Sequence, residues 1–205
     1  MTKTKEDERL IHRLEAFSDI VIGFCIAELG LSLRVPGSVA ALAHTPMTVV
    51  QFGVAFILIA SLWGLHNRLF ANYFVPNRVS ITLNFFMLAA LILTVYFFQT
   101  LRSLGSVSPL PAAYCLASFG VVYLLLGVMW ALGSANRWAE LSDTLAQQGV
   151  RRAGSLIIIG GSMFAFGATL VMKPQANIFE AMLLIAIISA AYRAVAPHII
   201  RRWLR

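Results

Sequence analysis

The hydrophobic positions of the chain fall into six long apolar segments separated by short polar stretches. The segments cover roughly residues 14–33, 48–71, 79–101, 110–135, 153–172 and 177–197. Each is bounded by proline, glycine or charge, and each reaches the length of about 20 residues that a helix needs to cross a membrane. The longest polar gap, residues 136–152, resembles a short amphipathic connector. The pattern predicts an all-α, polytopic membrane protein with six transmembrane helices in a single transmembrane domain, residues 1–205.

Composition supports a membrane protein. The chain is 59% hydrophobic and 12% charged, whereas soluble domains carry about 25% charged residues. The first ten residues, MTKTKEDERL, are hydrophilic and carry charges of both signs. A cleavable signal peptide would enter an apolar stretch almost at once, so we expect the first helix to remain in the mature protein.

The basic residues give an orientation for the predicted helices. The net charge is +7, but the charges gather at helix ends on alternate loops, which favours a topology signal over nucleic-acid binding. One set of tails and loops holds thirteen of the 16 basic residues: Lys3, Lys5, Arg9, Arg13, Arg68, Arg78, Arg137, Arg151, Arg152, Arg193, Arg201, Arg202 and Arg205. The other loops hold Arg34, Arg102 and Lys173. The positive-inside rule then predicts that both termini are cytoplasmic.

Small residues inside the apolar segments indicate packing positions. They are Cys25 and Cys115, and in the fifth segment the pairs Gly154 with Gly161 and Gly160 with Gly167. Both cysteines are expected to be buried small hydrophobes and not a disulfide. Each glycine pair is seven residues apart, which places its members on one helix face and allows close helix approach.

The first apolar segment carries two acidic residues where lipid would disfavour them. Asp19 and Glu28 are nine residues apart, about 900° at 100° per residue, so they lie on opposite faces of one helix. Val21, Phe24, Glu28 and Leu31 share one stripe, and Asp19 shares the other with Ile22, Ile26 and Leu33. Because intramembrane carboxylates usually face a partner or a watery cavity, one face is expected to meet a pathway or symmetry axis. The other is expected to meet neighbouring helices.

Asp19 needs hydrogen-bond donors at its depth in the membrane. His66, Asn84 and Arg13 are the nearest plausible donors in the sequence. We therefore expect a buried polar cluster that ties the first three helices together, although a histidine at a helix end is also a common interfacial anchor. Trp63 is assigned, with most other tryptophans and tyrosines, to lipid contact and the interfacial belts.

Enzyme signatures are missing from the sequence. It contains no GxxxxGK[ST], HExxH, paired CxxC or GxSxG motif, and no TVGYG filter. We therefore predict that the protein is not an enzyme, and we expect neither a cofactor nor a metal site. The remaining possibilities are passage of a solute through the membrane or structural support.

The first half of the chain resembles a known family. The RxxxFSD pattern is present as Arg13 to Asp19, and the first segment ends in Leu33-Arg34-Val35-Pro36. The second segment contains Trp63-x-x-His66-x-Arg68, and Asn84 stands early in the third. These motifs resemble the endolysosomal potassium channels that lack the usual P-loop filter, together with their bacterial six-helix homologues. The second half matches only in helix count and length.

The resemblance implies a homotetramer in which four copies of helix 1 line a pore for potassium or other monovalent cations. Bacterial members place bulky aliphatic residues five, nine and twelve residues after the motif aspartate, which correspond here to Phe24, Glu28 and Leu31. The resemblance also implies a supporting network that holds helix 1 against helices 2 and 3. Its members would be Arg13, Phe17, Ser18, Asp19, His66 and Asn84.

Glu28 departs from the aliphatic residue of the family. An ionised ring of four carboxylates would attract cations and weaken size discrimination, whereas a protonated ring would form a plug or a proton relay. An ion pair within the subunit, for instance with Arg102, is the simpler alternative. The predicted function is a cation channel, with a proton-coupled carrier, a proton-conducting channel or a non-conducting scaffold as alternatives. Because a single six-helix unit resembles the bacterial form, a prokaryotic inner membrane is the expected location.

Overall fold

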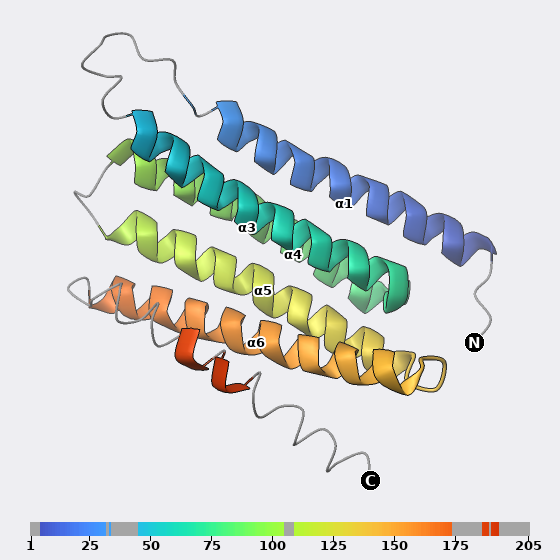
Figure 1. The fold of residues 1–205 in the computed structure, drawn as a ribbon. Coiled ribbons are helices and arrows are strands. Elements are labelled where there is room, and N and C mark those ends of the chain that lie inside the picture. The colour runs from blue at the N-terminus through green and yellow to red at the C-terminus, as the bar shows by residue number, and fades with distance from the viewer. Residues whose placement is uncertain are drawn as a thin grey trace. The chain divides into compact units, whose positions relative to one another are not determined.

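The chain forms long helices throughout the part that the structure describes. The structure is a computed structural model that describes residues 5–31, 33, 45–104, 109–173, 186–188 and 190–192. Its long helices are α1 (Lys5–Leu31), α3 (Thr45–Asn72), α4 (Arg78–Leu104), α5 (Leu110–Asn136) and α6 (Asp143–Met172) (Figure 1). Four of them, α3 to α6, are long and apolar enough to cross a membrane. The protein is an all-α, multi-pass membrane protein.

The hydrophobic pattern located the middle helices closely. The predicted segments 48–71, 79–101 and 110–135 end within three residues of α3, α4 and α5. Most of the predicted segment 177–197 lies outside the described residues. The predicted orientation, with both termini cytoplasmic, stays a prediction, as does the single domain over residues 1–205.

The predicted connector at residues 136–152 was wrong in its extent. Helix α6 begins at Asp143, so its first three turns are built from residues assigned to the connector. Residues 143–152 are mostly polar, so the sequence shows no regular spacing of apolar residues there. Polar residues nevertheless form helix readily. Asp143 in the first turn also favours the helix, because a negative charge stabilises the positive end of the helix dipole.

The chain divides into two compact units, Met1–Arg68 and Leu69–Arg205. In the first unit, α1 begins with three acidic residues that suit a helix N-terminus: Glu6, Asp7 and Glu8. One stripe of α1 is buried, with members three or four residues apart: Ile11, Leu14, Ser18, Ile22, Cys25 and Leu29. Helix α3 shows the same spacing in its buried residues Ala55, Ile59, Leu62 and His66. Each helix therefore presents one face to the interior.

In the second unit, α5 packs against both α4 and α6. Glycines bring the backbones of α5 and α6 together, because a methyl group at Gly160 would come within 2.5 Å of the Leu124 backbone nitrogen. A methyl group at Gly120 would come as close to the backbone nitrogen of Phe164. Gly167 faces α5 in the same way, whereas Gly154 lies against Tyr192. Such close backbone approach is typical of helix pairs in membranes.

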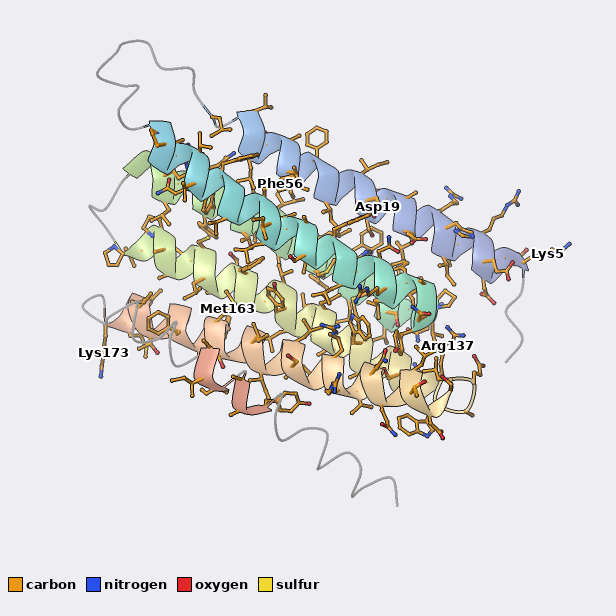
Figure 2. All side chains as sticks on the ribbon, in the orientation of Figure 1. Lys5, Asp19, Phe56, Arg137, Met163 and Lys173 are labelled. Carbon is orange, nitrogen blue, oxygen red and sulfur yellow. The ribbon has the colours of Figure 1, made fainter. Side chains whose placement is uncertain are left out.

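The corner between α3 and α4 is tied to the corner between α5 and α6. The Tyr73 hydroxyl donates a hydrogen bond of 2.9 Å to the Leu145 carbonyl, and the Tyr73 ring lies 4.6 Å from that of Trp130. Arg137 donates to the Asn72 carbonyl at the end of α3 and, over 3.2 Å, to Glu140 (Figure 2). The hydrogen bond from Arg137 lowers the pKa of the Glu140 carboxyl. The carbonyl of Asn72, the last residue of α3, thus gains a partner that it cannot find within its own helix.

Replacing Gly160 with alanine should weaken the contact between α5 and α6. The added methyl group would meet backbone atoms that cannot rotate away, so we expect a loss of about 1–3 kcal/mol, as for other overpacked interiors. Thermal unfolding of the purified protein in detergent, followed by fluorescence-detected size exclusion, measures the loss as a lower unfolding temperature.

Gly161 is the matched control, one residue further along the same helix. Among the residues that the structure describes, a methyl group there would meet only the end of the Leu124 side chain, at 3.9 Å. Gly161→Ala should therefore leave the unfolding temperature nearly unchanged. Equal effects of the two substitutions would contradict the packing described here.

Candidate functional site

Helix α1 has a second apolar face, opposite its buried stripe. The four large side chains of this exposed stripe are Phe17, Ile20, Phe24 and Leu31, with exposed fractions of 46%, 65%, 72% and 79%. On the buried stripe, Ile22 and Leu29 are each only 1% exposed. At about 100° per residue the two stripes lie on opposite sides of the helix. In a membrane, the face that the fold leaves open can be covered by lipid or by other helices.

Glu28 lies beside the exposed stripe, between Phe24 and Leu31. Its side chain is exposed, and it follows Phe24 by four residues and precedes Leu31 by three, about one helical turn in each direction. Placing a carboxylate at the centre of a membrane helix costs about 2.5 to 3.5 kcal/mol on insertion scales. The predicted stripe of Phe24, Glu28 and Leu31 is exposed along its whole length in the single chain.

Asp19 lies on the other flank of α1 and has a hydrogen-bond partner on α3. The indole Nε1 of Trp63 donates to the Asp19 carboxylate over 2.8 Å. Figure 2 shows the Asp19 side chain on the side of α1 that faces α3. Because Asp19 and Glu28 are about 180° apart around the helix, the Asp19 carboxylate joins α1 to α3 and the Glu28 carboxylate lies on the open side.

Three members of the predicted supporting network are fully buried. Ser18, His66 and Asn84 are each 0% exposed and come from α1, α3 and α4. The Ser18 hydroxyl donates to the Leu14 carbonyl one turn earlier, over 2.8 Å. Burying polar side chains this completely is costly unless they are hydrogen-bonded, so these positions are built for specific contacts.

Two other members of that network lie elsewhere on α1. Arg13 is exposed near the N-terminal end of the helix. Phe17 is 46% exposed and belongs to the same apolar stripe as Phe24 and Leu31. The RxxxFSD pattern therefore distributes its residues over both faces: Ser18 is buried, Asp19 reaches α3, and Phe17 extends the exposed stripe.

The sequence interpretation missed Trp63 as a partner of Asp19. It named His66, Asn84 and Arg13 as donors and left Trp63 to the lipid belt, whereas the structure gives the indole N–H to the carboxylate. A tryptophan combines a large apolar ring with a single donor that usually finds a partner. The position of Trp63 three residues before His66 was the available signal.

Among the described residues, no group of three or more histidine, cysteine or acidic side chains could hold a metal ion. Cys25 and Cys115 are free thiols, so the expectation of no disulfide holds for this pair. What α1 offers is an apolar surface with a single carboxylate beside it.

Comparison with known sequences relates the first half of the chain to a channel family. The family model described as the endosomal/lysosomal potassium channel TMEM175 matches residues 13–94. A protein named potassium channel from Marivirga tractuosa is 33% identical over 84 residues, which are 41% of this chain. The match covers 34% of that relative, so the chain spans about a third of its length.

Comparison with solved structures extends the likeness to nearly the whole chain. The crystal structure of a variant of the potassium channel MtTMEM175, in complex with a nanobody–MBP fusion protein, matches with a TM-score of 0.62. The match covers 98% of this chain and 94% of that one at 19% sequence identity, so it bears on the fold. Over residues 13–94 the chain is thus similar in sequence to the TMEM175 potassium channel family, and over nearly its whole length it is similar in fold to MtTMEM175.

Proposed function

We propose that the protein is a channel for potassium or other monovalent cations, assembled as a homotetramer around a pore lined by four copies of α1. The observation that carries this proposal is the exposed stripe of α1, with Phe24 and Leu31 outward and Glu28 beside them. The Marivirga relative and MtTMEM175 are both described as potassium channels, which supports potassium as the permeant ion.

A pore explains the composition of α1 better than contact with lipid. Between Leu14 and Leu31 the helix carries three acidic residues, Glu15, Asp19 and Glu28, and α1 is not among the four helices that meet the length and composition of a lone membrane span. A charged side chain inside a membrane usually faces a partner or a water-filled cavity. Covering the exposed stripe with three other copies of α1 provides such a cavity.

The apolar residues of the stripe would form the constriction. Phe24 and Leu31 are seven residues apart, so rings of their side chains would be separated by about 10 Å along the pore. Narrow rings of apolar side chains exclude water and thereby stop ions, and a small widening lets both return. Gating would then need only a modest movement of α1.

The remaining helices would surround and support the pore. Helices α3 to α6 and the predicted segment 177–197 would complete six membrane spans with α1. The excess of arginine and lysine on one set of loops supports cytoplasmic termini at both ends. The bacterial origin of the Marivirga relative is consistent with a prokaryotic inner membrane.

Purified protein in liposomes with a potassium gradient should release potassium down the gradient. A channel gives flux that saturates weakly, because ions pass without a conformational cycle for each one. Slow, saturable flux coupled to proton movement would favour a carrier that titrates at Glu28. The absence of any flux from a protein that remains assembled would indicate a scaffold and contradict the proposal.

A cysteine introduced at Leu31 should make the channel sensitive to a water-soluble, cationic thiol reagent. The background for this experiment carries Cys25→Ala and Cys115→Ala. Leu31 is 79% exposed in the protomer and would line the pore, so modification should remove most of the flux. The matched control is Leu29→Cys, two residues earlier on the buried stripe, where Leu29 is 1% exposed. Equal inhibition at both positions would argue against a pore on the exposed side.

Breaking the hydrogen bond between Trp63 and Asp19 should weaken the assembly without changing ion preference. In a double-mutant cycle, Trp63→Phe and Asp19→Ala should show a coupling of about 1 kcal/mol in the stability of the detergent-solubilised protein. The reversal potential of any remaining current should be unchanged, because this flank of α1 faces α3.

Trp138→Phe is the control for loss of an indole group. Trp138 is 40% exposed and Trp63 is 43% exposed, so the two substitutions remove similar surfaces. Trp138→Phe should show no coupling with Asp19→Ala. A Trp63→Phe variant with unaltered stability and normal conduction would show that the hydrogen bond has no supporting role.

A further inference from the structure

We propose that Glu28 is the residue by which this channel distinguishes cations from anions. This inference rests on the proposed function, because it assigns a role to one position of the proposed pore. It begins from the sequence of the pore helix: from Ile20 to Leu31, Glu28 is the sole charged residue. Any discrimination by side-chain charge along this length of α1 must therefore come from Glu28.

The apolar neighbours of Glu28 cannot supply that discrimination. Phe24 and Leu31 are 72% and 79% exposed, and their side chains carry no charge. Rings of such side chains repel ions of both signs, because both lose hydration in a dry constriction. A charge placed between two apolar rings acts in a region of low dielectric, where its effect on a passing ion is stronger than in open water.

The placement of Glu28 on the helix suits this role. It is exposed and lies about 40° from Phe24 and about 60° from Leu31 around the helix axis, so the three side chains share one side. Asp19 could not substitute, because it lies about 180° away and accepts the hydrogen bond from Trp63. In a fourfold assembly, Glu28 would contribute one carboxylate from each protomer at a single level.

Selection by the sign of an ion's charge and selection by ion size are two separate properties of a pore. A ring of flexible carboxylates attracts every small cation, so it selects by sign of charge and only weakly by size. At position 28 this chain has a group that favours cation entry. We therefore expect cations to be strongly preferred to chloride, and potassium to be only weakly preferred to sodium.

The test is the reversal potential of the full-length protein in planar bilayers under a tenfold gradient of KCl. A current carried only by potassium reverses at about 59 mV, the value for a tenfold ratio of a univalent ion. The wild type should reverse close to this potential. Glu28→Gln, which has nearly the same size but no charge, should reverse nearer to zero. Glu28→Lys should move the reversal potential past zero, toward the value for chloride.

Two further variants make the result specific. Glu28→Asp keeps the charge and should keep the reversal potential of the wild type, which a purely steric role would not predict. Glu8→Gln removes the same charge from the exposed first turns of α1, on the side away from Phe24 and Leu31, and should leave the reversal potential unchanged. Size exclusion of each variant in detergent confirms that it still assembles.

The outcomes distinguish this inference from the proposed function. If the wild type carries no current, the proposed channel fails and the role of Glu28 fails with it. If the wild type conducts but Glu28→Gln and Glu28→Lys reverse at the wild-type potential, the channel stands and the role of Glu28 is overturned. That second result is expected if an ion pair within the subunit, such as one with Arg102, neutralises the carboxylate.

Discussion

The structure depends on one property of α1, which is apolar on two opposite sides. One stripe of α1 is buried within the chain and runs from Ile11 to Leu29. The other stripe is exposed, runs from Phe17 to Leu31 and leaves a second apolar surface uncovered. The two carboxylates of the apolar stretch lie on the flanks between these stripes. Asp19 accepts a hydrogen bond from Trp63 of α3, and Glu28 lies toward the exposed stripe. One side of the helix thus packs within the chain, and the other side stays exposed.

The second unit is held together by close contacts of the main chain. Helices α5 and α6 meet at glycines, where their backbones approach more closely than any larger residue would allow. The contact between the two helices is therefore tightly packed. Tyr73 and Arg137 tie the end of α3 to the corner between α5 and α6. These contacts involve backbone carbonyls, which must find partners where water is scarce. The unit therefore offers a rigid frame built from main-chain contacts.

Much of the fold could be predicted from hydrophobic pattern alone, because membrane helices must be long, apolar and internally hydrogen-bonded. The pattern failed at Asp143 to Arg152, where the helix continues into mostly polar sequence and its buried positions, Ala146 and Gly149, are too small to stand out as an apolar period. The separation of Asp19 from Glu28 followed from helix geometry. The Trp63 partner did not, because a tryptophan at a membrane boundary has two ordinary roles, and only the arrangement of α1 and α3 shows which one applies. Phe17 was assigned with its motif neighbours, although consecutive residues of a helix point in different directions.

The proposed channel requires that the exposed stripe of α1 face the same stripe of other copies across a symmetry axis. The most direct measurement is an experimental structure of the protein in a lipid bilayer, determined without imposed symmetry. The account predicts four protomers whose Phe24, Glu28 and Leu31 side chains surround a common axis. A monomer, or an assembly in which these three side chains contact lipid, would contradict it.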